Sequence, residues 1–163
     1  MENINATPAQ YYSYIKGLAQ KHKLLKHTDS EKHYFRGELE EFYMSFRNDI
    51  NFPCLIAENF TLEFVTEDGV CKKIRETPFI VAESYKEEND YNDIDTKQNN
   101  CEVIGDEILR RLKFDQRNMC GYEFEYGEGI PVLNEANKYV GIRYTVSVKS
   151  VFDDDYNPEN WDE

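Results

Sequence analysis

The sequence predicts an α+β domain in which helices pack on one face of a four-stranded antiparallel sheet, in the order α-α-β-β-α-β-β. The first observation is that apolar residues recur every three to four positions in three segments, as they do in amphipathic helices. The second is that they alternate with polar residues in four other segments, as in half-buried strands. Because a helix separates the strands into two pairs, each pair is expected to form a hairpin.

The chain has 163 residues, of which 40% are hydrophobic, and this is enough to build the core of one domain. We expect a single domain over residues 1–152, with a helical part at 7–49 and a sheet part at 52–152, followed by an acidic tail at 153–163. No window reaches the roughly 18 apolar residues of a membrane-spanning helix, and the first residues do not resemble a secretion signal. We therefore expect a soluble, unsecreted protein that does not act at a membrane.

The first helix is predicted to begin after Thr7 and to reach about Leu25. Thr7, Pro8 and Gln10 form a capping box with proline at the first helical position, since the threonine hydroxyl can accept a hydrogen bond from the Gln10 amide. The apolar positions of this segment have helical spacing: Tyr11, Tyr14, Ile15, Leu18 and Leu25. A second helix, closed by Asp49, is predicted from the spacing of Phe35, Leu39, Phe42 and Phe46.

The first hairpin is predicted over residues 52–85. Alternation indicates one long strand at 52–64, with Leu62 and Phe64 on the face that is expected to be buried. A turn follows at residues 67–69, where aspartate and glycine are typical hairpin residues, and residues 70–85 form the returning strand. Because Pro78 cannot donate a hydrogen bond to a neighbour, we expect this strand to lie at an edge of the sheet or to be bulged there.

The second half of the chain is predicted to contain one helix and the second hairpin. Residues 86–100 are polar and are expected to be a mobile loop, and the third helix follows on the spacing of Cys101, Ile104, Ile108 and Leu112. A third strand at 122–126 leads through a turn-rich connection at 127–137 to a final strand with an apolar face of Val140, Ile142, Tyr144, Val146 and Val148. On the other face, Arg143 is expected to meet Glu123 or Glu125 across the ladder.

The net charge of −13 is unevenly distributed, because residues 1–50 hold seven Lys/Arg and seven Asp/Glu, so that the other 113 residues carry all of it. Such an acidic body argues against specific nucleic-acid binding, which requires clustered cations. The cations of the first part form a basic stretch: Lys16, Lys21, Lys23, Lys26, Lys32 and Arg36. This asymmetry can guide head-to-tail association of like subunits, and the plain alternative is a solvated helix face.

Sequence motifs for catalysis, cofactors and metals are absent, and we expect a protein that is not an enzyme. No phosphate-binding glycine loop, dinucleotide fingerprint or nucleophile elbow occurs. The cysteines and histidines lack the spacing of metal ligands: Cys54, Cys71, Cys101, Cys120, His22, His27 and His33. We interpret Glu123 and Glu125 as part of an outward polar face of the strand, and not as the two catalytic carboxylates of a glycosidase. The alternating acids after Asp153 resemble the start of a calcium loop, but Pro158 stands where such a loop needs glycine.

Three segments carry a resemblance to a known family. They are Asn51-Phe-Pro-Cys-Leu-Ile before the long hairpin, the helical segment Val103-Ile-Gly-Asp-Glu-Ile-Leu-Arg-Arg-Leu112, and the final strand Gly141-Ile-Arg-Tyr-Thr-Val-Ser-Val. In this order of elements, residues 33–152 resemble tail-terminator (tail-completion) proteins of tailed bacteriophages and prophages, especially those of gut Bacteroidetes. The resemblance implies a structural subunit that forms a ring, usually a hexamer, which caps the tail tube and joins it to the neck of the virion after assembly in the bacterial cytoplasm.

The expected partners are other copies of the chain, the tail-tube protein and the neck proteins, and the resemblance implies a lumen that passes DNA without holding it. Two other classes stay open: a head-tail connector or other neck protein, and a small monomeric protein-binding module. Contacts are also expected at residues 86–100 and 127–138. The individual residues expected to contact subunits or partners are Lys21, Lys23, Lys26, Arg36, Arg143, Lys149, Asp153, Asp154, Asp155 and Trp161.

Overall fold

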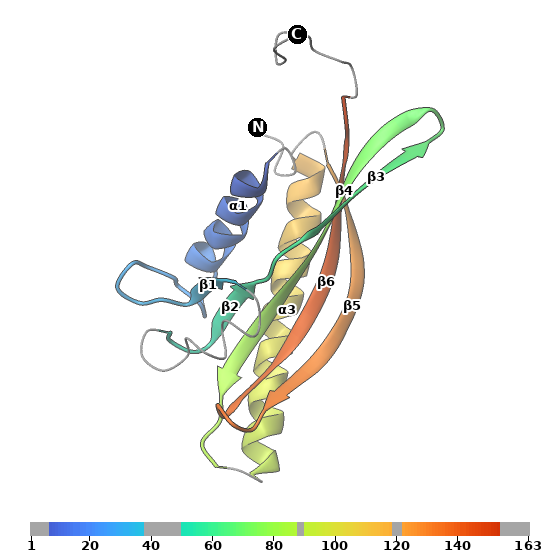
Figure 1. The fold of residues 1–163 in the computed structure, drawn as a ribbon. Helices are drawn as coiled ribbons and strands as arrows, with labels where there is room; N and C mark the ends of the chain where they lie inside the picture. The colour runs from blue at the N-terminus through green and yellow to red at the C-terminus, as the bar shows by residue number, and fades with distance from the viewer. Residues whose placement is uncertain (1–6, 38–49, 88–89, 119–121, 154–163) are drawn as a thin grey trace, which may run out of the picture.

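The computed structural model describes residues 7–37, 50–87, 90–118 and 122–153, and it confirms the α+β class (Figure 1). Within these residues there are two helices and a six-stranded sheet rather than a four-stranded one. The elements in chain order are α1 (Pro8–Lys21), β1 (Tyr34–Arg36), β2 (Cys54–Ala57), β3 (Thr61–Glu67), β4 (Val70–Ser84), α3 (Tyr91–Asn118), β5 (Glu123–Asn134) and β6 (Tyr139–Val151).

The sheet has the strand order β1-β2-β4-β6-β5, and β3 also pairs with β4. Both predicted hairpins are present, as β3–β4 and β5–β6, and the long pairing of β4 with β6 joins them. The prediction of a purely antiparallel sheet is wrong, because β1 pairs with β2 in parallel. Phe35 lies in β1 and not in a helix, whereas residues 38–49 of the predicted second helix lie outside the described residues.

The predicted strand at 52–64 is divided into β2 and β3, and Pro78 of β4 lies opposite the break. The Pro78 carbonyl accepts a hydrogen bond from the Glu58 amide at 3.1 Å. The nitrogen and carbonyl of one strand residue point to the same neighbour, so the donor that proline lacks faces the gap between β2 and β3. The prediction that this strand lies at an edge of the sheet is wrong, because β4 lies between β2 and β3 on one side and β6 on the other.

Helix α1 begins as predicted and ends earlier. Thr7 is the N-cap, and its side-chain oxygen accepts a hydrogen bond from the Gln10 amide at 3.2 Å. The helix stops at Lys21, and Leu25 is buried in the turn that follows it. Leu25 thus contributes to the core without helical geometry, which its helical spacing did not indicate.

Helix α3 has 28 residues and begins at Tyr91, so the prediction of a mobile loop over residues 86–100 is wrong for most of that segment. Asp90 caps the helix, because its carboxylate accepts a hydrogen bond from the Asp93 amide at 3.2 Å. One apolar residue anchors the first turns: Ile94 is buried against Tyr85 and Val140. A capping side chain and a single buried anchor are enough to extend a polar helix that packing stabilises further along.

Strand β5 continues to Asn134, so the predicted turn-rich connection at 127–137 is mostly strand. The pairing with β6 shifts between Tyr126 and Gly129, as at a β-bulge. Glycine is needed beside this shift, because a Cβ on Gly127 would lie 2.4 Å from the Thr145 carbonyl oxygen. The final strand is confirmed, with a buried apolar face of Val140, Ile142, Tyr144, Val146 and Val148.

Both described helices cover the same face of the sheet, as predicted, and the main core lies between them and the strands (Figure 1). Its members include Tyr11, Ile15, Leu55, Phe79, Val81, Ile104, Ile108, Tyr144 and Val146. A smaller apolar cluster around Ile56 and Ile80 lies on the opposite face. The far half of the β3–β4 hairpin extends away from the two helices (Figure 1), so neither helix covers its side chains.

Candidate interaction surfaces

Three of the predicted contact residues lie together at the C-terminal end of α1. Lys21 is the last residue of the helix, and Lys23 and Lys26 follow in the turn; all three are exposed. Residues 8–26 contain four lysines and no aspartate or glutamate. Lysines are stabilised here because the C-terminal end of a helix carries partial negative charge. This lysine cluster is a compact cationic surface on an acidic protein.

A pocket of about 170 Å³ lies between this end of α1 and the middle of α3. Apolar atoms dominate its wall, with Leu18 and Ile108 as the apolar side chains, and its polar side chains are Lys21, His22, Glu107 and Arg111. Nε2 of His22 lies 2.8 Å from Oε2 of Glu107, and this contact joins the two helices across the pocket. The combination of an apolar wall with a mainly cationic rim suits a group that is itself partly apolar and partly anionic.

Arg111 is held in place at the pocket by a buried acid. Its Nε donates to Oδ2 of Asp115 at 2.9 Å, and the same oxygen accepts a hydrogen bond from the Tyr14 hydroxyl at 2.9 Å. Burial and the hydrogen bond to Asp115 raise the pKa of Tyr14, so its hydroxyl stays protonated and continues to donate. The Arg111 side chain is nevertheless 54% exposed, which leaves much of its guanidinium facing solvent at the pocket.

The other predicted cations do not join this cluster. The guanidinium of Arg36 lies 3.7 Å from the centre of the Tyr12 ring, which places Arg36 against α1 as a cation–π contact. Arg143 pairs with the buried Glu58 at 2.5 Å, so the prediction that it meets Glu123 or Glu125 is wrong. The cation that meets Glu125 is Lys149, at 2.9 Å. Arg143 and Lys149 lie on the face of the sheet opposite the helices, because their positions alternate with the buried face of β6.

The tail residues are described only at their start. Asp153 follows β6 and is exposed, whereas Asp154, Asp155 and Trp161 lie outside the described residues. The amide of Phe152 donates to the Cys71 carbonyl at 2.9 Å, so the chain stays beside β4 up to the point where the tail begins. The predicted contact residues that are described therefore occupy several separate places and do not form one site.

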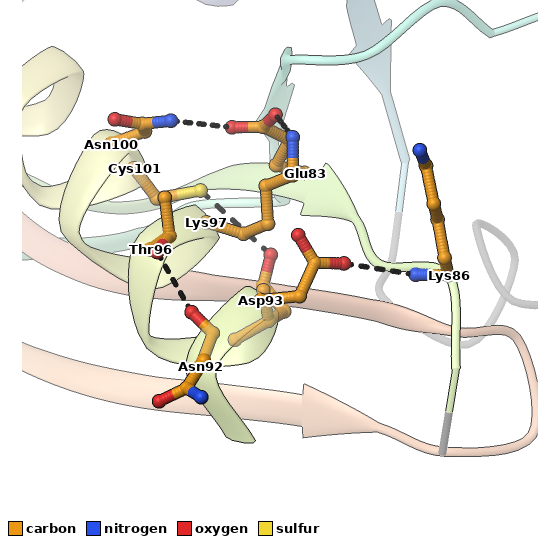
Figure 2. A network of polar contacts seen from close by, with 9 residues as sticks. Glu83, Lys86, Asn92, Asp93, Thr96, Lys97, Asn100 and Cys101 are labelled. Carbon is orange, nitrogen blue, oxygen red and sulfur yellow. Dashed lines mark hydrogen bonds and ion pairs between the residues drawn. The ribbon is translucent and has the colours of Figure 1, made fainter. Parts of the chain in front are cut away.

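A polar network joins the first half of α3 to β4 (Figure 2). Lys97 donates to Glu83 at 2.6 Å, and the Asp93 carboxylate accepts a hydrogen bond from the Lys86 amide at 3.1 Å. Cys101 lies in the same region, and its thiol donates to the Val140 carbonyl at 3.8 Å. Burial raises the pKa of Cys101 to about 12, so the thiol is not a nucleophile at neutral pH. The network attaches α3 to the sheet and lacks an activated group.

Two sets of exposed apolar residues were not predicted from the sequence. The first set, here called the hairpin patch, lies on one face of the β3–β4 hairpin and on the residue that follows β6: Leu62, Phe64 and Phe152. Val70 and Val151 are exposed on the opposite face of the sheet, because their partners in the ladder are Glu67 and Lys72. The rings of Phe64 and Phe152 are in contact, with 4.8 Å between their centroids. The second set lies on β5: Tyr126, Ile130 and Leu133. Alternation identified the faces of these strands, but it does not indicate whether another element covers a face.

Among residues 7–37, 50–87, 90–118 and 122–153, no group of three or more His, Cys, Asp or Glu side chains is arranged to hold a metal ion. Neither described helix combines the length and apolar character that crossing a membrane requires. The sequence matches no model of a known protein family. It also matches no curated protein.

Proposed function

We propose that the chain is a structural subunit that assembles with copies of itself into a ring, as its resemblance to tail-terminator proteins implies. The observation that carries this proposal is the hairpin patch. Phe64 is 50% exposed and Leu62 is 44% exposed, on a hairpin that extends away from the helices (Figure 1). Exposed apolar side chains that cluster in this way are typical of protein–protein contact sites, and aromatic residues dominate the energy of such sites.

The geometry favours head-to-tail contact. In the described part of the chain, β3 pairs only with β4 and β5 pairs only with β6, so these strands form opposite edges of the sheet. A contact between two different surfaces of neighbouring subunits generates a closed ring when the rotation between them closes. The hairpin patch provides one such surface, and the exposed apolar residues of β5 lie on the other side of the subunit.

The two edges differ in how readily they can pair with another strand. Strand β5 contains Pro131 and the irregularity between Tyr126 and Gly129, features that protect an edge from pairing. Strand β3 contains neither proline nor glycine, and threonine, valine and phenylalanine are prominent in it. The contact is therefore expected to use the side chains of the hairpin patch, with β3 rather than β5 as the strand that supplies backbone groups.

The charge of the chain suits the lumen of a ring at the end of a tail tube. A net charge of −13 repels a DNA duplex and does not bind it. The partners of the proposed ring are the tail-tube protein and the neck proteins, and its location is the tail and neck of the virion.

The test is the solution mass by light scattering over a series of protein concentrations, at low and moderate salt. We expect a mass that rises with concentration toward about six chains. Phe64→Ser should lower the mass, and Val103→Ser is the matched control, because Val103 is an apolar residue on α3 with a similar exposed fraction of 53%. A mass of one chain at every concentration would contradict self-assembly. Equal effects of the two substitutions would contradict the assignment of the hairpin patch as the contact.

A further inference from the structure

We propose that the pocket between α1 and α3 binds residues 154–163 of a second copy of the chain, with Trp161 against its apolar wall and the neighbouring acids against its cationic rim. This inference rests on the proposed self-assembly, because it requires two copies in contact. It concerns a different surface, however, so the absence of binding at the pocket would not contradict the proposed ring. The occupant is identified by its chemistry, because its charge and its aromatic residue complement the rim and the wall of the pocket.

The charges of the two segments are complementary. Residues 153–163 contain six carboxylates, no lysine or arginine, and the single tryptophan of the chain. The lysine cluster at the end of α1 belongs to a segment, residues 8–26, with four lysines and no carboxylate. Lys21 lines the pocket and is exposed. An anionic segment that reaches the pocket therefore passes the lysines of residues 8–26, and residues 8–26 contain no acid that could neutralise these lysines.

The size of the pocket fits one side chain. Its volume of about 170 Å³ is below the roughly 300–1,000 Å³ of typical small-molecule sites. Leu18 and Ile108 supply an apolar wall for an aromatic ring, and Arg111 can lie over or beside such a ring while it contacts a carboxylate. A Trp-Asp-Glu sequence, as in residues 161–163, places an aromatic ring and two carboxylates within three positions.

The position of the tail favours a second copy as its source. The hydrogen bond from Phe152 to Cys71 holds the last described residues beside β4, next to the hairpin patch. Figure 1 shows the end of β6 beside the β3–β4 hairpin, with α1 on the opposite side of α3. The described residues therefore end at the surface proposed to contact a neighbour, whereas the pocket of the same chain lies between α3 and α1.

The test uses Trp161 as the reporter. A synthetic peptide with the sequence of residues 153–163 is titrated into the full chain carrying Trp161→Ser, so that all tryptophan emission comes from the peptide. We expect a shift of the emission to shorter wavelength that saturates, and an affinity that falls as salt is raised. No shift up to millimolar peptide would overturn the proposal.

Charge substitutions at the pocket should change the affinity in opposite directions. Lys21→Gln and Arg111→Gln together should weaken peptide binding about tenfold, since each exposed ion pair contributes roughly two- to fivefold. Lys21→Gln alone removes the charge of an exposed side chain and should not disturb folding. Glu107→Gln should strengthen binding roughly twofold to fivefold, because it removes the acid of the rim. Lys86→Gln is the control: Lys86 contacts Asp93, which lies about 20 Å from Glu107 along α3.

A mixing experiment tests whether the segment comes from a second copy. The full chain with Lys21→Gln and Arg111→Gln keeps its tryptophan but has an impaired pocket, and the Trp161→Ser chain has an intact pocket and no tryptophan. A shift of the emission on mixing supports the proposal. If mixing has no effect, and if the emission of the unmodified chain is already shifted and independent of dilution, the segment occupies its own pocket and the proposal is wrong. Light scattering of the same samples reports self-assembly separately.

Discussion

The same substitution at two helix glycines should have different effects on stability. A Cβ added at Gly105 of α3 would lie 2.2 Å from Cε2 of Tyr144, whereas a Cβ at Gly17 of α1 would meet no atom within 4 Å. Ordinary contact begins at 3.4 Å, so Gly105→Ala requires the helix or the ring to move by about 1.2 Å. The Tyr144 ring is stacked on Phe79, which is fully buried, and this leaves it little room to move.

The magnitude follows from two opposing contributions. Replacing glycine by alanine inside a helix stabilises it by roughly 0.5–1 kcal/mol, and this gain applies to both positions. Overpacking a well-packed core costs about 1–3 kcal/mol, and this cost applies to Gly105 alone. The difference between the two variants therefore isolates the overpacking cost of about 1–3 kcal/mol. For a chain of this length it corresponds to roughly 2–12 °C in the melting temperature.

The assay is thermal and urea unfolding of the Gly105→Ala and Gly17→Ala variants, followed by circular dichroism. Gly17→Ala should raise the melting temperature, and Gly105→Ala should lower it relative to Gly17→Ala. Tyr144→Leu removes the ring atoms that the new methyl group would meet, so Gly105→Ala should cost less in that background, with a coupling of roughly 0.5–3 kcal/mol. Equal stabilisation by both alanine substitutions would refute the contact between α3 and Tyr144 as described.

Three further predictions concern buried polar groups. Burial and nearby Lys16 lower the pKa of His27, so the folded protein keeps it neutral; the free energy of unfolding should therefore fall as pH drops below about 6.5, and His27→Gln should flatten this slope in urea titrations. Thr77 shares a buried hydrogen bond of 2.5 Å with Tyr11; Tyr11→Phe should lower the free energy of unfolding by roughly 1–3 kcal/mol, and adding Thr77→Val should recover part of the loss. Burial raises the pKa of Cys54 and Cys101, so iodoacetamide should alkylate the partly exposed Cys71 before either of them in the native protein, and mass spectrometry showing faster labelling of either buried thiol would contradict their placement.

The sequence patterns that proved reliable are those that local geometry decides. The alternation of β6 and the capping of α1 by Thr7 depend on neighbouring residues only, and both are confirmed. The start of α3 was missed because residues 86–100 are polar, and the interaction that anchors them, Ile94 against Tyr85 and Val140, spans distant parts of the chain. Arg143 meets Glu58, which lies 85 positions away, and no pattern within β6 indicates that partner.

The candidate surfaces were predicted less well than the fold, for a related reason. Leu62 and Phe64 have the alternation of buried residues, but burial also requires a second layer, and neither described helix extends over the hairpin. The pocket between α1 and α3 depends on how two helices separated by 69 residues, 22–90, pack together. Only its cationic character was visible beforehand, in the basic stretch that contains Lys21.

The position of β4 has a consequence for how stability is distributed along the chain. Residues 79–82 of this strand pair with β2 and β6 and lie under the helices, whereas residues 70–74 pair with β3, and at 72–74 also with β6, in the hairpin that extends away from the helices. Backbone amides in the first segment should exchange with deuterium only when the whole domain unfolds, and those in the second should exchange through local opening. One continuous strand therefore supplies both the most rigid part of the domain and an arm that can adjust to a partner without loss of the core.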